Sequence, residues 1–251
     1  MEEKRETGPF VAFVLLDRPA WDPERFRADL LADWDIPCGD TAGDSGSLVF
    51  QAGSAMVAVS LVEYPVPDGE AERNAANNYL WPQAVEVTKP HKAHVLVAVI
   101  DREASPLDIA LLETKVAATC LKQPAALGVY TTGTVHPADF YREVADVIRE
   151  GKLPLLDWVH FGLYRTEKGM SAYTYGMKVF GKDEMEILDS SAQPAELREM
   201  LFDFAYYVLD SGVTLKDGET IGFTAEQKLP ISRSPGVSVD GDSLKIVYCP
   251  A

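Results

Sequence analysis

The spacing of apolar residues changes several times along the chain and predicts both strands and helices. The run at 10–16 is short and continuously apolar, which is typical of a buried strand. Over 22–34 the apolar residues recur at helical spacing behind an Asp-Pro pair, which predicts a capped helix. Two apolar runs separated by Gly53-Ser54 predict a hairpin over 47–62.

The middle of the chain continues with a strongly apolar run and a well-marked helix. The run "HVLVAVI" at 94–100 is apolar on both faces, which predicts a central strand in a sheet covered on both sides. A helix is expected up to residue 123, because Ser105 and a capping-box acid begin it and Pro124 stops it. We also expect a short helix at 68–80, a strand at 125–130 and a helix at 137–151.

The C-terminal part combines several strands with one long helix. The helix is predicted over 194–212, where apolar residues from Leu197 to Val208 fall on one face and Gly212 lies beyond the end. The predicted strands are 157–166, 169–180, 184–189, 213–215, 219–224 and 244–248.

These elements mix without the regular alternation of a parallel α/β fold. The expected class is therefore α+β, with a mixed, largely antiparallel sheet or sheets and helices packed on one side. The order β-α-β-β-α-β in the N-terminal half is typical of a ferredoxin-like sheet. A soft boundary near "REGKLPLLDW" divides 1–150 from 151–251. Because no glycine- or proline-rich linker separates the two halves, we expect them to pack as one unit.

Composition places the chain among soluble globular proteins. It has 251 residues, and its hydrophobic and charged fractions of 47% and 25% are ordinary. The longest apolar run is too short to span a bilayer, and the charged N-terminus lacks the apolar core of a secretory signal. Cys38, Cys120 and Cys249 are widely spaced and odd in number, unlike a disulfide framework or a zinc motif. These features predict a cytoplasmic protein without a cofactor.

Charge narrows the set of partners. A formal net charge of −16 and a pI near 4.6 oppose binding to nucleic acid and to anionic membranes. The acidic residues are spread along the chain, and solubility alone would account for them. The alternative is a negative surface for a basic protein partner, whose association complementary charge would accelerate.

The stretch Gly43-Asp44-Ser45-Gly46 matches the residues around the nucleophile of chymotrypsin-like serine proteases. That serine needs a histidine base oriented by a carboxylate, and in those enzymes both residues precede the serine. Here the first histidine is His91. We therefore interpret the stretch as a polar loop that leads into the strand at 47–52.

His91 and His94 would share one face only on a helix, where such a pair can bind a metal. On the predicted strand, positions three apart point to opposite faces, and a zinc site needs three or four converging ligands. We expect His94 on the sheet face that also carries Leu96 and Ala98, His91 in the preceding loop, and no metal site.

Asp157, Trp158 and His160 form a second candidate site. On the predicted strand Trp158 and His160 point the same way, so they could present an aromatic and a titratable group to a pocket. The same alternation describes a half-buried sheet face on which Tyr164 and Tyr173 of adjoining strands pack across from them. This packing interpretation is preferred.

Carboxylates supply the remaining candidates. Glu184 and Glu186 project from one side of a predicted strand and could bind a cation or act as acid and base. The preferred interpretation is the solvated face of an edge strand, where charge discourages aggregation. Glu113 lies on the helix after the central strand, where Cys120 is expected to be a small buried hydrophobe.

The C-terminal third carries three marks of one family. They are the Gly-x-x-x-Phe-Gly-x-x-Glu-x-Glu run from Gly176 to Glu186, the pair Tyr206-Tyr207, and "DGETIG" at 217–222. With them the chain resembles the bacterial domain of unknown function 4261 family, and "WPQAVEVTKPHKAHVLVAV" upstream also resembles chains that carry this domain. The resemblance implies a bacterial source and carries over no activity, cofactor or functional residue.

Two hypotheses of function follow. The first is a non-catalytic protein-binding module, such as an antagonist of a basic toxin, whose association would weaken with salt. The alternative is an enzyme that requires the two histidines His94 and His160 to lie together in one concave pocket. Neither hypothesis specifies an oligomeric state. The candidate binding residues are His94, Glu113, Asp157, Trp158 and His160, and all but Trp158 are also the residues of the enzyme alternative.

Overall fold

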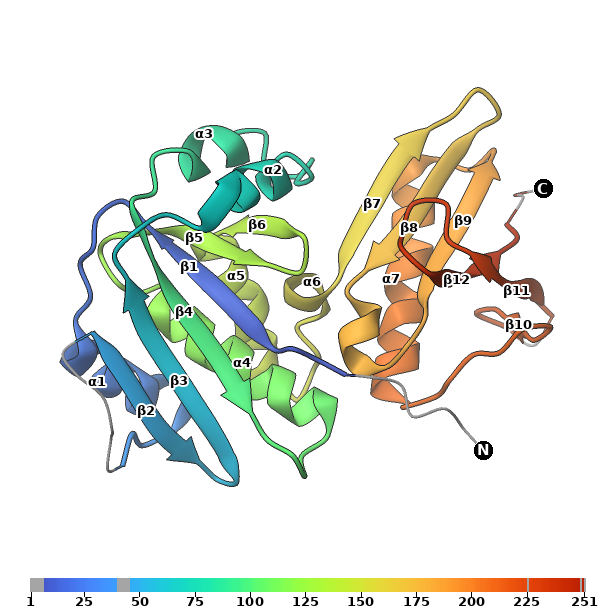
Figure 1. Cartoon of the computed structure of the whole chain (residues 1–251). Helices are drawn as coiled ribbons and strands as arrows, with labels where there is room; N and C mark the ends of the chain where they lie inside the picture. The colour runs from blue at the N-terminus through green and yellow to red at the C-terminus, as the bar shows by residue number, and fades with distance from the viewer. Residues whose placement is uncertain (1–6, 40–45, 225, 249, 251) are drawn as a thin grey trace. The chain divides into compact units, whose positions relative to one another are not determined.

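The computed structural model describes residues 7–39, 46–224, 226–248 and 250 (Figure 1). The chain divides into two compact units. The N-terminal unit is Pro9–Trp158, and the C-terminal unit is Val159–Ala251 with the few residues that precede Pro9. Gly8 belongs to the C-terminal unit, where its N–H donates to the carbonyl of Val179 over 2.9 Å. Residues 43–45 of the protease-like stretch and Cys249 lie outside the described residues.

The N-terminal unit is built on a six-stranded sheet in the order β2-β3-β4-β1-β5-β6 (Figure 1). All five strand pairings are antiparallel. The strands are β1 (Val11–Leu16), β2 (Ser47–Ala52), β3 (Ala55–Val62), β4 (Ala93–Ile100), β5 (Ala126–Thr131) and β6 (Thr134–Pro137).

The helices of this unit lie on both sides of the sheet. The two longest begin where the sequence predicts, because their caps form: Asp22 accepts the N–H of Arg25, and Ser105 accepts the N–H of Asp108. The shorter α6 ends the unit, where a strand had been predicted over 157–166. The helices are α1 (Pro23–Trp34), α2 (Glu70–Ala75), α3 (Ala84–Thr88), α4 (Pro106–Cys120), α5 (Ala138–Ala145) and α6 (Leu155–Trp158), with 3₁₀ turns at Pro67–Gly69 and Asp146–Glu150.

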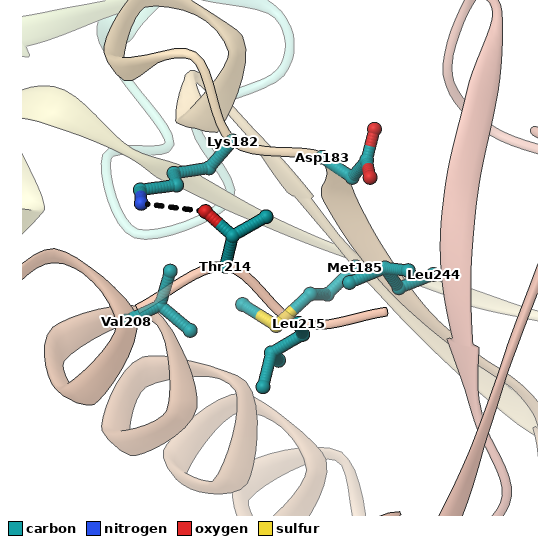
Figure 2. Close-up of a pocket in the computed structure, with 7 residues that line it drawn as sticks. All are labelled: Lys182, Asp183, Met185, Val208, Thr214, Leu215 and Leu244. Atoms are coloured by element: carbon teal, nitrogen blue, oxygen red, sulfur yellow. Dashed lines mark hydrogen bonds between the residues drawn. The ribbon is translucent and has the colours of Figure 1, made fainter. Parts of the chain in front are cut away.

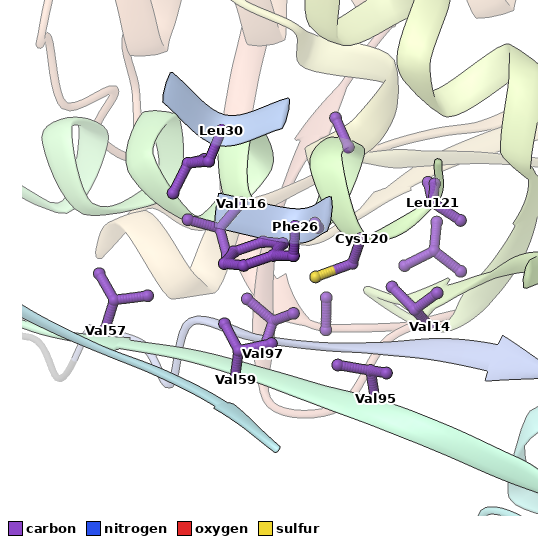
Figure 3. Packing of buried hydrophobic residues seen from close by; sticks show 14 of the residues in the cluster. Val14, Phe26, Leu30, Val57, Val59, Val95, Val97, Val116, Cys120 and Leu121 are labelled. Carbon is purple, nitrogen blue, oxygen red and sulfur yellow. The ribbon is translucent and has the colours of Figure 1, made fainter. Parts of the chain in front are cut away.

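The main core forms where α1, α4 and α5 cover one face of the sheet. Phe26 of α1 and Val116 of α4 pack on the row of valines from β3 and β4 that includes Val97 (Figure 3). Cys120 is fully buried in this core, as predicted. A second, smaller core lies on the opposite face, where α2 and α3 cover β5, β6 and Leu15 of β1.

The expectation of a sheet covered on both sides holds for only part of β4. Its residues Val95, Val97 and Val99 are buried in the main core. Leu96 and Ala98, on the other face, are only half-buried, and Ile100 is 53% exposed. The short helices α2 and α3 pack over β5 and β6, so these two helices leave the apolar second face of β4 only half-buried.

The C-terminal unit contains a second six-stranded sheet, in the order β10-β11-β12-β9-β8-β7. Only β12 and β9 pair in parallel among the described strands of this sheet. Helix α7 (Pro194–Asp210) packs on β7 and β8 with the predicted apolar face, from Leu197 to Val208, buried. The strands are β7 (His160–Arg165), β8 (Met170–Tyr175), β9 (Glu184–Ser190), β10 (Thr220–Ile221), β11 (Leu229–Pro235) and β12 (Asp242–Ile246), with a 3₁₀ turn at Met177–Phe180.

The α+β class with largely antiparallel sheets is confirmed. The ferredoxin-like arrangement is not found, because it contains βαβ units with parallel strands, whereas β1 pairs antiparallel with both β4 and β5. The expectation that helices pack on one side of the sheet holds for the C-terminal unit. It is wrong for the N-terminal unit, where α2 and α3 cover part of the second face. No helix within the described ranges is long and apolar enough to cross a membrane.

Candidate functional site

His91 lies just before β4 and His94 lies within it, and each ring contacts different groups of the N-terminal unit. His91 accepts the N–H of Val66 at Nε2 over 2.9 Å, and its Nδ1 lies 2.7 Å from the carbonyl of Thr88, which a neutral ring with the proton on Nδ1 satisfies. His94 packs edge-on against Phe13 and Tyr64, and burial lowers its pKa. Both rings are thus held as neutral structural groups of the N-terminal unit.

Glu113, Asp157 and Trp158 come together between helices of the N-terminal unit. The indole N–H of Trp158 donates to the hydroxyl of Thr114 over 2.8 Å, which ties α6 to α4. The adjacent Glu113 is 5% exposed and Asp157 is 1% exposed. Three of the five predicted binding residues therefore share one buried cluster, with Tyr141 of α5 as a further member.

Three of the four carboxyl oxygens in this cluster lack hydrogen-bond partners among the described residues. Oε1 of Glu113 and both carboxyl oxygens of Asp157 are buried without a hydrogen bond to any described residue. Burial raises the pKa of Glu113 to about 8. Burial, and then the charge of Glu113, raises the pKa of Asp157 well above its ordinary value. Burial thus favours the protonated form of both groups, and neither lines a described pocket.

His160 belongs to the C-terminal unit, whereas His94 belongs to the N-terminal unit. It begins β7 with its ring 6.2 Å from that of Tyr173, and burial lowers its pKa to about 4. Trp158 ends α6 and does not share a strand with His160, so the predicted alternation of these two side chains is wrong. No group of three or more His, Cys, Asp or Glu side chains within the described ranges is placed to hold a metal.

Glu184 and Glu186 are buried in the middle of the second sheet, which corrects their assignment to a solvated edge. Strand β9 lies between β12 and β8, and the two side chains are 2% and 0% exposed. Glu184 accepts the N–H of Gly176 and the hydroxyl of Thr174, each over 2.8 Å. Gly176 has φ 129°, which only glycine adopts readily. Gly176 therefore permits the turn after β8, and Glu184 holds this turn through the N–H of Gly176.

Glu186 fastens the β11–β12 hairpin to β9. Its carboxylate accepts the N–H of Ser238 over 2.7 Å and the hydroxyl of Ser243 over 2.5 Å, and Nζ of Lys245 lies 2.9 Å away. Burial would raise its pKa, but these hydrogen bonds outweigh burial and leave the pKa below its ordinary value. Both glutamates of the Gly176–Glu186 run thus have structural roles.

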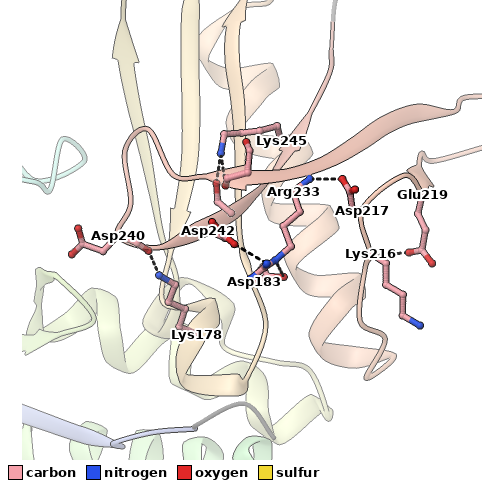
Figure 4. Close-up of polar contacts among 11 residues, drawn as sticks. Lys178, Asp183, Lys216, Asp217, Glu219, Arg233, Asp240, Asp242 and Lys245 are labelled. Atoms are coloured by element: carbon pink, nitrogen blue, oxygen red, sulfur yellow. Dashed lines mark hydrogen bonds and ion pairs between the residues drawn. The ribbon is translucent and has the colours of Figure 1, made fainter. Parts of the chain in front are cut away.

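Polar contacts also fix the turn that precedes β10. The N–H of Arg233 donates to Asp217 over 2.7 Å, and the guanidinium of Arg233 contacts Asp183 and Asp242 (Figure 4). Lys182 anchors the chain after α7 by donating to the carbonyl of Val213 over 2.7 Å. It also donates to the Thr214 hydroxyl (Figure 2). The segment that follows α7 is therefore held in one place without regular secondary structure.

A groove with a volume of about 540 Å³ opens between α7 and this segment. The rings of Phe204 and Phe223 stack 4.9 Å apart, and Phe223 and Tyr207 remain 52% and 49% exposed. Asp203 and Glu219 add two exposed carboxylates. The full lining is Asp203, Phe204, Tyr207, Val213, Thr214, Leu215, Glu219, Thr220, Ile221, Gly222 and Phe223.

The chemistry of this groove suits binding. Its lining contains no histidine, cysteine, lysine or arginine, so it offers exposed aromatic rings and two carboxylates without an imidazole or a thiol nucleophile. Glu199, Asp203 and Tyr207 follow one another every four residues and are all exposed on α7. The groove is the candidate functional site of the C-terminal unit, and none of the five predicted binding residues lines it.

The sequence signal for the groove was present in the marks of the family resemblance. Tyr207 and most of "DGETIG" line it, whereas Glu184 and Glu186 stabilise the fold behind it. Exposure of Tyr207 and the approach of residue 223 to α7 could not be inferred from spacing, because both depend on how the irregular segment folds back.

Comparison with known proteins confirms the family resemblance of the C-terminal region. Residues 173–247 match the family model described as "Domain of unknown function (DUF4261)". The match includes every residue that lines the groove. No curated protein and no solved structure matches the chain significantly.

Proposed function

We propose that the protein is a non-catalytic protein-binding module whose C-terminal groove takes a basic segment of another protein. The observation that carries the proposal is the composition of the groove, which combines exposed Tyr207 and Phe223 with the carboxylates of Asp203 and Glu219. Aromatic side chains are enriched at binding hot spots because they bury a large area with few rotatable bonds.

Charge supports a basic partner. The lining has two carboxylates and no lysine or arginine, and the whole chain carries a formal net charge of −16. A lysine or arginine of the partner would pair with Asp203 at the rim and lie over the exposed tyrosine ring, where a cation is attracted by the π face. A basic toxin that the protein would antagonise is one partner of this chemistry.

The experiment begins with affinity capture from source cells at low salt, followed by calorimetry with the purified partner. Tyr207→Ala and Asp203→Lys should each weaken binding by about 1–3 kcal/mol, roughly 5- to 150-fold. Glu167→Lys is the matched control, because Glu167 is exposed in the β7–β8 turn. This substitution changes the net charge by the same amount as Asp203→Lys.

Added salt should weaken the association of the unmodified protein, since exposed charges are screened. Equal loss of affinity in Asp203→Lys and Glu167→Lys would show that net charge, and not the groove, binds the partner. An acidic partner, or affinity unchanged by Tyr207→Ala, would contradict the proposal.

A further inference from the structure

Strand β10 lies at one edge of the C-terminal sheet and also borders the groove. Among the described strands it pairs only with β11, opposite Pro230 and Leu229. Its two residues, Thr220 and Ile221, both line the groove together with Gly222. Thr220 is exposed. The groove therefore gives a partner access to the edge of a sheet as well as to side chains.

The hydrogen-bond pattern shows which backbone groups of β10 face the open edge. In an antiparallel pair, successive residues direct their N–H and C=O groups alternately toward the neighbouring strand and away from it. Thr220 lies opposite Pro230, which has no N–H to donate. The adjoining bond runs from the N–H of Ile231 to the carbonyl of Glu219 over 2.9 Å. Thr220 is therefore at a position that is not hydrogen-bonded to β11, and its N–H and C=O point to the open edge.

Contacts around β10 hold this edge in place before a partner binds. The N–H of Lys216 donates to the carboxylate of Glu219 over 2.8 Å (Figure 4). The N–H of Phe223 donates to the side-chain carbonyl of Gln227 over 2.9 Å. A Cβ at Gly222 would overlap the backbone carbonyl of Gln227, so glycine is required where the chain folds back. An edge that is already ordered costs little conformational entropy to occupy.

We propose that the groove takes its basic segment as an extended strand that pairs with the open edge of β10. The proposal rests on the proposed function and adds to it the conformation of the segment and the backbone groups that recognise it. In strand addition, main-chain hydrogen bonds join a peptide to a sheet edge, and alternate side chains of the peptide meet the adjoining surface. Here Thr220 supplies the hydrogen bonds, and Asp203 and Tyr207 meet the alternate side chains.

The groove distinguishes β10 from the other edge of the same sheet. Strand β7 ends the strand order on the opposite side and lines no described pocket. The carboxylates of Asp203 and Glu219 beside β10 select a basic strand, because an acidic strand would be repelled. An edge of two residues forms few hydrogen bonds, so side chains must contribute as well. Binding therefore requires both the backbone of Thr220 and the side chain of Tyr207.

The test is a fluorescence anisotropy titration of the full chain with a short, capped, labelled peptide of alternating arginine and threonine. Alternation places every arginine on one face of an extended peptide. Thr220→Pro removes the N–H that points to the open edge and breaks no hydrogen bond with β11. We expect it to weaken binding by about tenfold. Thr220→Ala is the matched control, because it loses the same side chain and keeps the N–H, and it should bind like the unmodified protein.

A second measurement changes the peptide and leaves the protein intact. The same peptide methylated at every backbone nitrogen keeps its side chains and charges and has no N–H to donate. We expect it to bind the unmodified protein at least about tenfold more weakly. Circular dichroism checks that Thr220→Pro folds, and the methylated peptide decides the matter if it does not.

Unchanged binding in Thr220→Pro, equal losses in Thr220→Pro and Thr220→Ala, or equal binding of the two peptides would each overturn strand addition. If Tyr207→Ala and Asp203→Lys still weaken binding in those cases, the groove binds through side chains alone and the proposed function stands. A peptide that does not bind the unmodified protein would also overturn strand addition. The partner captured from source cells would then still test the proposed function.

Discussion

Among the described residues, each unit buries two carboxyl side chains, and the two pairs differ in what surrounds them. Glu184 and Glu186 of β9 receive hydrogen bonds from backbone N–H groups, hydroxyls and, for Glu186, a lysine. Glu113 and Asp157 receive none at Oε1 of the first and at either oxygen of the second. A buried carboxylate costs several kcal/mol unless donors replace its water. The hydrogen bonds of the first pair hold neighbouring segments together, whereas burial without such donors raises the pKa values of the second pair.

The difference teaches how to separate structural from functional interpretations of a buried acid. Burial alone is shared by all four side chains, which are at most 5% exposed. Donors oppose the effect of burial to different extents: the pKa of Glu186 lies below its ordinary value, whereas burial still raises the pKa of Glu184 despite its hydrogen bonds. Without donors to Oε1, the pKa of Glu113 rises to about 8. Stability should respond to pH and to mutation in different ways in the two units.

The largest effect is expected from pH on the N-terminal unit. The pKa of Glu113 rises from 4.5 to about 8 on folding, so the native state keeps a proton that the unfolded chain loses between these values. The free energy of unfolding should therefore fall as the pH rises from 4.5 towards 8, by up to about 5 kcal/mol. Urea unfolding followed by tryptophan fluorescence measures it, because all four tryptophans lie in this unit.

The double variant Glu113→Gln/Asp157→Asn is the control for this pH effect. It keeps the shapes of both side chains and removes both titrating protons. Its free energy of unfolding should vary much less over the same pH range. A pH dependence equal to that of the unmodified protein would show that the two acids do not cause it.

The next effect concerns the C-terminal unit, where removing the carboxylate of Glu186 should lower the free energy of unfolding. Glu186→Ala leaves the ammonium of Lys245 and the N–H of Ser238 without their carboxylate. We expect a loss of about 3–5 kcal/mol, as for other broken buried pairs. Hydrogen exchange across β9, β11 and β12 measures this loss. The control Glu167→Ala, at an exposed turn position, should leave exchange unchanged. Unchanged protection in Glu186→Ala would contradict the structural role assigned to Glu186.

The smallest effect runs in the opposite pH direction. Burial lowers the pKa of His160 from 6.5 to about 4, so between these values the unfolded chain binds a proton that the native state lacks. The C-terminal unit should lose about 3 kcal/mol of stability as the pH falls from 6.5 to 4. NMR titration of the ring protons reports the pKa directly. A titration midpoint near pH 6.5 would show that burial does not lower the pKa of His160.

Local signals predicted many of the elements correctly. The Asp-Pro and Ser-Pro starts of α1 and α4, and the apolar face of α7, depend on residues within a few turns of one another. Strands β6 and β11 were missed because they are short or rich in polar residues, and α6 was taken for a strand. In α6, the tertiary hydrogen bond from Trp158 to Thr114 stabilises a turn of helix that the local pattern does not indicate.

The candidate site was predicted only in part. Sequence reasoning identified Glu113, Asp157 and Trp158 as chemistry-bearing residues, and the fold brings them together. It assigned Glu184 and Glu186 to an exposed edge, because the alternation of a strand is the same at an edge and in the centre of a sheet. It did not locate the groove, although the family marks Tyr207 and "DGETIG" lie in it.

The sequence by itself determined the α+β class, the capped helices and the negative charge, because periodicity, capping and composition act locally or over the whole chain at once. Only the tertiary structure decided that β9 is central, that one face of β4 is largely half-buried, and that Oε1 of Glu113 and both carboxyl oxygens of Asp157 have no hydrogen bond to a described residue. These outcomes depend on contacts between residues far apart in the chain, such as the hydrogen bond between Glu186 and Ser243 across 57 positions. Which distant strand supplies such a partner is set by the packing of the complete unit, and no local pattern encodes it.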